Sequence, residues 1–350
     1  MSRVTIVGAG VMGTATVWPL SDNGHEVRLV GTHLDGDIIK SCKISGLHPR
    51  LKRRLPPGVT PFYVEELETA LDGADFILSG VNSMGVRWIG RTLAPYLKPG
   101  SRLIAVTKGL ESDESGNLLI LPEVLRSELP EGVRDQVSLA AIGGPCIAGE
   151  LAARRPTCVF FGCRELETAQ FLANVFRTSY YHIQTTQEIA ALEVAVSLKN
   201  AYAMAVSLAA GWLQVAGGPD EAGAHMHNPA AALFAQAVFE MGCIMKALGL
   251  RGEYASGLPG VGDMFVTCRG GRSSMLGSLM GEGKTYQQGR AILKGETLEA
   301  ALIVEQMAIA LPKLEGRGLL SPGDIPLMRA LIEVVAHGQP LDVDFDLFFR

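Results

Sequence analysis

The first thirteen residues constrain the fold of this chain more than any other stretch. Residues 4–7 (VTIV) are rich in β-branched side chains and predict a strand, and residues 8–13 (GAGVMG) follow directly. A strand, a G-x-G-x-x-G turn and a helix together bind the pyrophosphate of a dinucleotide. Gly8 permits the tight turn, Gly10 lets the pyrophosphate approach the backbone, and Gly13 lets the helix pack on the strand. The stretch predicts dinucleotide binding, and its alternative is a glycine-rich turn that holds no ligand.

Strands and helix-length segments alternate through the first half of the chain. Further strands are predicted at residues 26–30, 75–80, 102–107, 137–142, 157–162 and 179–184. Helix-length segments such as 86–97 and 118–128 separate them. This alternation is typical of a parallel, doubly wound sheet whose ligands bind at the carboxyl ends of the strands.

After residue 188 the hydrophobic pattern becomes helical and largely stays so. Helices are predicted at residues 189–212, 228–248, 256–267, 272–281, 286–293, 299–312 and 325–337. The fold class predicted is an α/β N-terminal Rossmann-type doubly wound sheet with an all-α C-terminal domain. Its expected domains are a dinucleotide-binding domain at 1–188 and a helical substrate and catalytic domain at 189–350.

The predicted helix at 189–212 carries only two charged residues, Glu193 and Lys199. Apolar and small residues surround every face, so we expect the helix to be buried. An ammonium group in such a place must be paired or must lose its proton. Asn200 follows the lysine, and Glu193 lies about two turns earlier on nearly the same face. Two interpretations stay open on these residues alone: a structural ion pair, or a general acid/base lysine tuned by burial.

Polar and small residues follow several predicted strands at the edge where a ligand is expected. They are Asn82-Ser83, Lys108-Gly109 and Gly143-Gly144-Pro145-Cys146. The position of Lys108 favours a contact with substrate or cofactor over an ordinary surface lysine.

A second polar cluster occurs within the helical half. Asp263 and Thr267 lie four residues apart, on one helical face. Gly270-Gly271-Arg272 then precedes a helix and predicts an anion cradle, because an arginine fork suits phosphate. Its alternative is a helix cap with a solvated arginine.

The choice of dinucleotide is not settled by the second strand. This strand ends in Gly31-Thr32-His33, and the first acid beyond it is Asp35. The carboxylate that usually accepts the ribose 2′-hydroxyl of NAD is therefore missing from its expected place, and NAD and NADP both stay open. Residues 42–58 are basic and contain several prolines, which predicts a solvated loop.

Composition excludes several classes of protein. The net charge of −5 gives no general attraction to nucleic acid or to anionic membranes. The six cysteines form no CxxC pair and no metal-like grouping with histidine, so no metal is expected and a reducing compartment is favoured. No charged-then-apolar leader is visible, which favours a cytoplasmic location. The uncharged residues 201–218 contain Ser207 and Gln214 and lead into Gly-Gly-Pro, so we expect no membrane span.

Taken together, these motifs resemble the NAD(P)-dependent glycerol-3-phosphate dehydrogenase family along nearly the whole chain. The matching segments are GAGVMGTA at 8–15, HP at 48–49, LPPGV at 55–59, TKGLE at 107–111, GGPCIAGE at 143–150, LEVAVSLKN at 192–200, GLPGVGDMFVTC at 257–268 and GGRSS at 270–274. The resemblance implies hydride transfer between a nicotinamide cofactor, NAD or NADP, and the pair dihydroxyacetone phosphate and sn-glycerol 3-phosphate. It also makes the acid/base interpretation of Lys199 the stronger one. The apolar helices of the second domain suit a homodimer.

The resemblance implies a role for individual residues. Lys199 matches the proton donor and acceptor of the family, with Lys108 and Asp263 as its catalytic partners. The substrate-binding residues it implies are Lys108, Gly144, Cys146, Lys199, Asn200, Asp263, Thr267, Arg272 and Ser273. The cofactor-binding residues it implies are Gly8, Gly10, Val11, Met12, Gly13, Thr32, His33, Asn82, Lys108, Ala148, Arg272 and Glu299.

The chain departs from the family pattern at five places, three of which line the expected substrate pocket or its rim. Val194-Ala195 stands in place of a glycine pair after the helix glutamate. Cys146 stands in place of a serine, Ser273 of an asparagine, Asn82 of a proline, and Met12 of a bulky aromatic residue. A related polyol phosphate or ketose phosphate therefore stays open as substrate. A 2-keto acid reductase and a nucleotide sensor without catalysis are the further alternatives.

Overall fold

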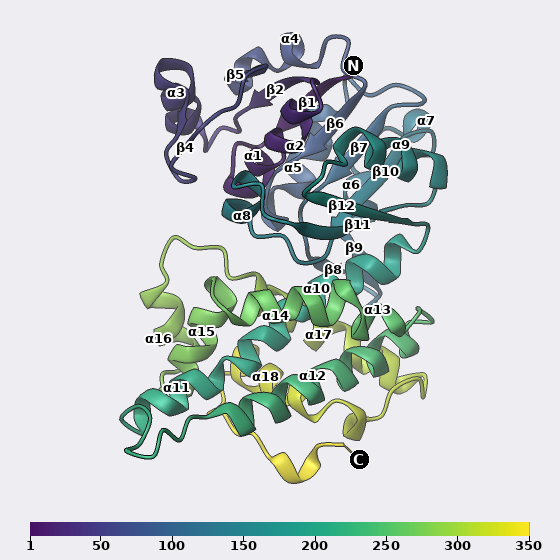
Figure 1. Ribbon diagram of the computed structural model, residues 1–350. Helices are drawn as coiled ribbons and strands as arrows, with labels where there is room; N and C mark the ends of the chain where they lie inside the picture. The colour runs from purple at the N-terminus through teal and green to yellow at the C-terminus, as the bar shows by residue number, and fades with distance from the viewer. Residues whose placement is uncertain (350) are drawn as a thin grey trace. The chain divides into compact units, whose positions relative to one another are not determined.

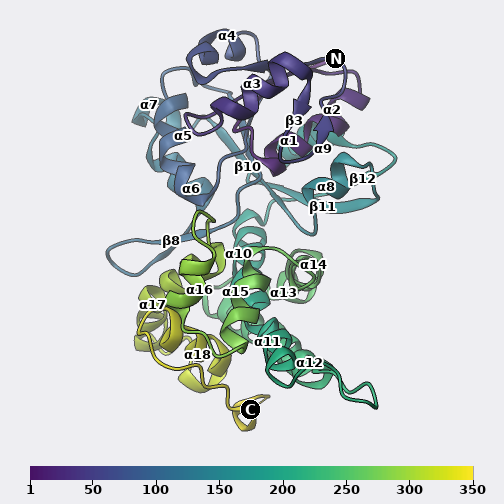
Figure 2. The ribbon, with the colours of Figure 1, turned by 90° about the vertical axis from the view of Figure 1, so that its left-hand side faces the viewer.

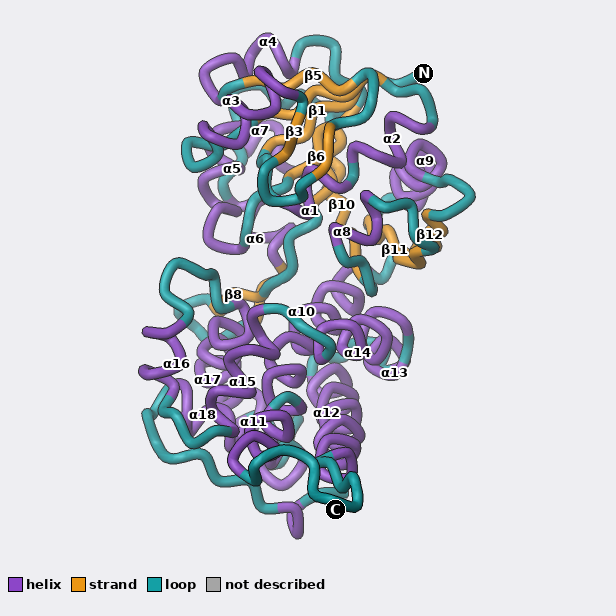
Figure 3. The backbone as a smooth tube through the Cα atoms, turned by 60° about the vertical axis from the view of Figure 1, so that its left-hand side comes forward, coloured by secondary structure: helices purple, strands orange, loops and turns teal. Residues whose placement is uncertain are grey.

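The computed structural model describes residues 1–349, which divide into two compact units. Unit 1 comprises Met1–Lys108 and Leu121–Ile189, and unit 2 comprises Gly109–Ile120 and Ala190–Arg350. Strands dominate the centre of unit 1 and helices make up nearly all of unit 2 (Figure 3). The predicted fold class is confirmed, although the short segment 109–120 groups with the helical unit.

Unit 1 is built on one eight-stranded sheet in the order β12-β11-β10-β7-β6-β1-β2-β5 (Figure 1). Its strands are β1 (Arg3–Val7), β2 (Glu26–Val30), β5 (Val59–Phe62), β6 (Phe76–Ser79), β7 (Arg102–Ala105), β10 (Ser138–Gly143), β11 (Thr157–Cys163) and β12 (Tyr181–Thr186). The six strands from β5 to β10 in this order pair in parallel, so their carboxyl ends share one edge. The motifs predicted to bind ligand follow these ends.

The pair of β10 and β11 is antiparallel, which the expectation of a purely parallel sheet did not include. Helix α8 (Ala148–Ala152) connects these two strands. Five helical residues span only about 8 Å, whereas a six-residue strand spans about 20 Å. The connection therefore does not carry the chain back to the opposite edge, and β11 runs in the reverse direction.

Helices cover both faces of the sheet in unit 1 (Figure 2). Helices α5, α6 and α7 lie on one face, and α1, α2, α8 and α9 lie on the other. The remaining bounds are α1 (Val11–Ala15), α2 (Val17–Asp22), α3 (Gly36–Ser45), α4 (Leu67–Leu71), α5 (Val86–Leu93), α6 (Leu121–Ser127), α7 (Glu131–Arg134) and α9 (Leu166–Phe176), with 3-10 turns η1 (Val64–Glu66) and η2 (Ser83–Gly85). The core between the layers contains fully buried side chains such as Ile6, Leu29 and Phe161.

Two segments before residue 130 differ from the sequence prediction. The predicted loop at 42–58 contains the end of α3 and a hairpin of β3 (Leu47–His48) and β4 (Arg53–Arg54). The sequence pattern did not predict this hairpin, because its side chains are mostly charged and face solvent. Only His48 is fully buried among its strand residues. The predicted helix at 118–128 begins only at Leu121, because residues 118–120 form a strand.

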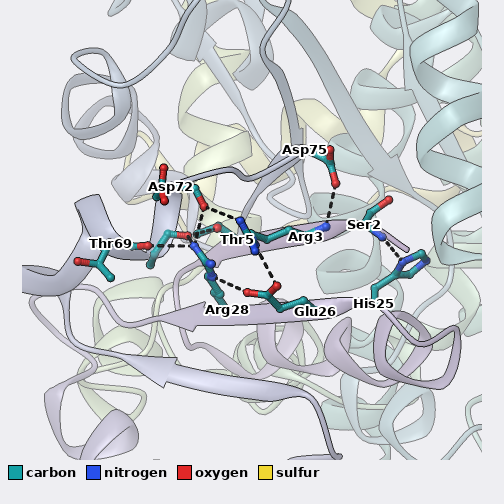
Figure 4. A network of polar contacts seen from close by, with 10 residues as sticks. Ser2, Arg3, Thr5, His25, Glu26, Arg28, Thr69, Asp72 and Asp75 are labelled. Atoms are coloured by element: carbon teal, nitrogen blue, oxygen red, sulfur yellow. Dashed lines mark hydrogen bonds and ion pairs between the residues drawn. The ribbon is translucent and has the colours of Figure 1, made fainter.

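The amino ends of the parallel strands are joined by a charged network (Figure 4). Glu26 pairs with Arg3 and with Arg28, each at 2.9 Å, and Asp75 accepts from the backbone N–H of Arg3 at 2.8 Å. These groups are partly exposed, so each pair contributes little to stability. The register of β1 and β2 places Arg3 opposite Glu26, at the edge opposite the ligand motifs.

Unit 2 consists of helices and one hairpin. Its elements are β8 (Leu110–Ser112), β9 (Leu118–Ile120), α10 (Ile189–Val206), α11 (Leu208–Val215), α12 (His227–Ala247), α13 (Glu253–Ser256), the π-helical η3 (Leu258–Gly262), α14 (Asp263–Cys268), α15 (Arg272–Gly281), α16 (Tyr286–Ile292), α17 (Glu299–Gly316), η4 (Pro322–Asp324), α18 (Pro326–Val335) and η5 (Phe345–Leu347). The hairpin is held on α17, where Ser112 N donates to Gln306 Oε1 at 2.6 Å.

The predicted helix at 189–212 is buried as expected, but it breaks between α10 and α11. Ser207 lies at the break, and its hydroxyl donates to Ala203 O at 2.7 Å. Such a bond to the preceding turn competes with the regular backbone pattern and bends helices. The predicted helix at 256–267 likewise contains the π-helical turn, where a Cβ on Gly260 would lie 2.0 Å from Ala255 O.

Helix α15 lies against α10 and α11 at backbone distance. A Cβ added to Gly277 would lie 2.0 Å from Met204 O, and one added to Gly281 would lie 2.2 Å from Leu208 O. Both pairs are spaced by four residues, so the glycines follow one face of α15. This contact fixes α15, and with it Arg272 at its first turn, relative to α10.

Within residues 1–349, two helical segments are long and apolar enough to cross a membrane by length and composition. The first is Ile189–Val215, and 94% of its apolar 18-residue window is buried within the protein, which is typical of a core helix. The second is α12, where 44% of the apolar 18-residue window is buried.

Candidate functional site

Direct contact between glycines holds the turn after β1. Gly8 has φ +112°, and a Cβ there would lie 2.6 Å from the carbonyl carbon of Gly80, which follows the neighbouring strand β6. A Cβ on Gly13 would lie 2.6 Å from Gly8 O. Only glycine fits either position, so the strand, the turn and the first helix can pack at backbone distance.

Gly10 is different, because its surroundings are open. A Cβ there would meet only Gly80 O, at an ordinary 3.6 Å, and the N–H of Gly10 has no hydrogen-bond partner within residues 1–349. Val11 and Met12 begin α1 immediately afterwards. An open stretch of backbone with an unused donor fits the pyrophosphate of a dinucleotide.

The end of β2 carries the next predicted cofactor residues. Thr32 donates from both its N–H and its hydroxyl to Asp35 Oδ2, at 2.9 and 2.8 Å. His33 is exposed, and its ring meets Trp88 of α5 edge to face at 5.3 Å between centroids. The loop therefore offers an aromatic pair and a carboxylate already bound to its own backbone.

The carboxyl ends of β6, β7 and β10 meet at the same edge. Thr107 donates its hydroxyl to Val81 O at 2.6 Å, which ties the two loops after β6 and β7 together. Lys108 Nζ donates to Gly144 O at 3.2 Å. The structure thus brings together Lys108 and Gly144, two of the predicted site residues.

Three further predicted residues line these loops. Asn82 is exposed and caps η2 by accepting from Gly85 N at 3.1 Å. Cys146 and Ala148 are partly buried, and both pack against the core of unit 1. Cys146 and Ala148 follow β10, at the edge of the sheet where cofactor contacts are predicted.

In unit 2, Lys199 is joined to two of the predicted site residues, Asp263 and Thr267. Its Nζ lies 2.8 Å from Asp263 Oδ1 and donates to Thr267 Oγ1 at 2.6 Å. Thr267 in turn donates its hydroxyl to Asp263 O at 2.7 Å, so its oxygen accepts from the lysine. Lys199 is 5% exposed and Asp263 is 2% exposed. The π-helical turn before α14 places Asp263 at the start of that helix, and π-helical turns are common at functional sites.

Asn200, beside the lysine, has an unsatisfied donor. Its side chain is 4% exposed, and Nδ2 has no hydrogen-bond partner within residues 1–349. A buried amide without a partner costs about 1–3 kcal/mol. A ligand that accepts a hydrogen bond there would remove this cost.

Arg272 and Glu299 are brought together by the start of α15 and the start of α17. The guanidinium lies 3.8 Å from Glu299 and also 3.8 Å from Glu296, which sequence reasoning did not single out. All three side chains are partly exposed, so the pairs are weak and exchangeable. Ser273 is buried in the same first turn.

Two groups near α10, the partly buried Cys268 and the fully buried Glu240, were missed by sequence reasoning. Burial raises the pKa of the Cys268 thiol to about 12, although the nearby charge of Lys199 lowers it. Glu240 accepts from Tyr202, from Gln236 and from two backbone N–H groups at the start of α18, and burial raises its pKa to about 7. A glutamate within an apolar helix is the only sequence signal for this network.

The chain matches two family models over most of its length. A model described as NAD-dependent glycerol-3-phosphate dehydrogenase N-terminus matches residues 3–169, and one described as the C-terminus of the same enzyme matches residues 188–344.

Curated relatives agree with these matches. An NADP(+)-dependent glycerol-3-phosphate dehydrogenase of Archaeoglobus fulgidus is 38% identical over 285 residues, which cover 81% of this chain and 82% of the relative. A glycerol-3-phosphate dehydrogenase [NAD(P)+] of Bacillus velezensis is 30% identical over 350 residues, which cover 98% of this chain and 92% of the relative.

Solved structures share the fold. Glycerol-3-phosphate dehydrogenase of Coxiella burnetii is 24% identical with a TM-score of 0.79, covering 97% of this chain and 96% of that one. A ketopantoate reductase of Ralstonia eutropha is 16% identical with a TM-score of 0.56, and the match covers 95% of this chain and 97% of that one. The models and the sequence relatives go further than the fold, and the chain belongs to the NAD(P)-dependent glycerol-3-phosphate dehydrogenase family.

Proposed function

We propose that this protein interconverts dihydroxyacetone phosphate and sn-glycerol 3-phosphate with NAD(H) or NADP(H). The observation that carries the proposal is the buried amine of Lys199, paired with Asp263 and Thr267 and followed by the unsatisfied amide of Asn200. A structural ion pair would not require an unsatisfied neighbour. The names of the relatives support the same reaction.

In the proposed reaction, Lys199 handles the proton at the C2 oxygen of the substrate. A bound reduced nicotinamide would supply the hydride to C2, and the ammonium group of Lys199 would give its proton to the carbonyl oxygen as that oxygen becomes a hydroxyl. In the reverse direction the neutral amine accepts that proton. Asp263 stabilises the charged amine in its buried position, and Asp263 and Thr267 hold it at a fixed point.

We assign Arg272 to a phosphate group and Lys108 to the substrate carbonyl. Arg272 has exchangeable carboxylate partners, so a phosphate group can replace them and gain a forked contact. Lys108 adds a positive charge at the edge of the sheet in unit 1, where it would polarise the carbonyl. We assign substrate contacts to Lys108, Gly144, Cys146, Lys199, Asn200, Asp263, Thr267, Arg272 and Ser273. We assign cofactor contacts to Gly8, Gly10, Val11, Met12, Gly13, Thr32, His33, Asn82, Lys108, Ala148, Arg272 and Glu299.

Steady-state assays with dihydroxyacetone phosphate against both NADH and NADPH test this function. The wild-type protein should reduce the substrate, and Lys199→Met should lower kcat at least about 100-fold. Lys246→Met, at an exposed lysine of α12, is the matched control and should keep full activity. Activity toward 2-keto acids without activity toward dihydroxyacetone phosphate would overturn the assignment.

A larger ketose phosphate belongs in the same assay, because Cys146 and Ser273 depart from the family pattern at expected substrate positions. Turnover of such a compound ahead of dihydroxyacetone phosphate would change the substrate but keep the chemistry.

We also propose that the protein is a cytoplasmic homodimer. Helix α12 supports the dimer, because its window of mean hydropathy 1.3 is only 44% buried and Phe239 is exposed on it. The six cysteines form no disulfide, which suits a reducing compartment. Analytical ultracentrifugation of the wild type and of Phe239→Glu tests the dimer; a monomeric wild type would refute it.

A further inference from the structure

The residue between the first two glycines, Ala9, is held from both sides by side chains that lie far away in the sequence. Its N–H donates to Asp35 Oδ2 at 3.2 Å, and its carbonyl oxygen lies 2.9 Å from His48 Nε2. Asp35 comes from the loop after β2, and His48 comes from the small hairpin of β3 and β4. Both Ala9 and His48 are fully buried.

The role of His48 as a donor follows from its second ring nitrogen. Nδ1 accepts from the backbone N–H of Leu51 at 3.0 Å, so the proton of the neutral ring is on Nε2 and points at Ala9 O. Burial lowers the pKa of His48, which keeps the ring neutral near pH 7. The histidine therefore bridges the hairpin turn and the glycine loop with two directed bonds.

These bonds determine how the peptide groups of the loop are turned. In a trans peptide the C=O and the following N–H point in opposite directions. Because His48 holds Ala9 O, the N–H of Gly10 faces the other way, and this is the donor that has no partner within residues 1–349. In the preceding peptide, Asp35 accepts from Ala9 N–H, so Gly8 O points the other way, towards Gly13. A Cβ added to Gly13 would lie 2.6 Å from this oxygen.

We propose that His48 is a positioning residue for the dinucleotide: it presets the peptide between Ala9 and Gly10 so that the Gly10 N–H faces the pyrophosphate. The inference deepens the proposed function, since it concerns the cofactor loop of that same reaction. Without the histidine bond, this peptide can rotate, and the cofactor must order it on binding. The histidine acts before the cofactor arrives and touches no reacting atom.

Calorimetric titration of the purified protein with NADPH and with NADH tests the proposal independently of activity. His48→Leu should raise both dissociation constants at least about 10-fold, the size expected for one lost directed bond and an unsatisfied carbonyl. His48→Gln can place an N–H near Ala9 O and an oxygen near Leu51 N, so it should recover most of the affinity. His182→Leu, at an exposed histidine of β12, is the matched control and should bind as the wild type.

Steady-state kinetics separate positioning from catalysis. At saturating cofactor, His48→Leu should keep kcat and the KM for dihydroxyacetone phosphate within about 3-fold of the wild type. If that variant does not fold, Asp35→Ala, which removes the acceptor on the other side of Ala9, should weaken both dinucleotides in the same way. Unchanged dissociation constants in a folded His48→Leu, or a folded His48→Gln that binds no better than His48→Leu, would overturn the proposal. Failure of the proposed reaction would appear instead as a wild-type protein that binds dinucleotide but does not reduce the substrate.

Discussion

The Nζ atom of Lys199 lies 2.8 Å from Oδ1 of Asp263, and both side chains are almost completely buried. Removing one partner of such a pair leaves a buried charge without compensation. Asp263→Leu should therefore lower the free energy of unfolding by about 3–5 kcal/mol. The double variant Lys199→Met/Asp263→Leu should recover most of this loss, while both variants lose at least about 100-fold in kcat.

Urea unfolding of the wild type, both single variants and the double variant measures this coupling. A double variant as unstable as the sum of the two single losses would show that the ion pair is not the dominant interaction. Stability and activity would then have to be explained by separate contacts.

Arg272 should distinguish phosphate binding from general positive charge. Arg272→Lys keeps the charge but loses the planar fork, so the KM for dihydroxyacetone phosphate should rise about 10-fold or more. The matched control is Arg269→Lys, because Arg269 lies over the ring of Phe265 and pairs with no carboxylate within residues 1–349. Equal KM values for the two variants in steady-state assays would contradict the assignment.

Glu240 should make stability depend on pH. Its pKa in the folded protein, about 7, is above the ordinary value of 4.5, mainly because of burial. A raised pKa contributes stability that is complete below about pH 4.5 and is lost as the pH rises through about 7. The difference amounts to about 3 kcal/mol.

Unfolding free energies at pH 5.5, 7 and 8 check this slope. Glu240→Gln should be less pH-dependent than the wild type over this range, whereas Glu333→Gln, an exposed glutamate on α18, should not differ from it. If the unfolding free energies of the wild type and of Glu240→Gln changed equally with pH, a group other than Glu240 would be responsible for the pH dependence.

Replacing glycine by alanine should change stability in opposite directions at the α15 contact and at an open position on α12. Gly277→Ala should destabilise the protein by about 1–3 kcal/mol, because its Cβ would lie 2.0 Å from Met204 O. Gly242→Ala, on α12 with no atom within 4 Å of the added Cβ, should stabilise it by about 0.5–1 kcal/mol. Thermal unfolding of both variants measures these changes in stability. A stabilised Gly277→Ala would mean that α15 can move away from α10 at low cost.

Local patterns predicted much of this molecule. The strand–glycine–helix signal located Gly8, Gly10 and Gly13, because their requirements are set within a few residues. The buried helix pointed to Lys199 for the same reason: a charge among apolar neighbours is visible in one segment. Asp263 and Thr267 followed from a spacing of four residues.

Long-range packing explains what sequence reasoning missed. Gly80 is needed only because Gly8 faces it across neighbouring strands. His48 lies in a basic stretch that predicted a loop, and its contact with Ala9 depends on how a hairpin folds back. The reversal of β11 depends on the length of α8. None of these relationships leaves a periodic trace in the sequence.

The placement of the hairpin of β8 and β9 with unit 2 limits how this protein can be dissected. The polypeptide leaves unit 1 after Lys108, returns at Leu121 and leaves again after Ile189. A fragment that ends near residue 188 would retain the hairpin but lack α17, and the buried Leu110 and Ile120 would face water. Such a fragment should aggregate, and a soluble excised nucleotide-binding half would require a short linker in place of residues 109–120.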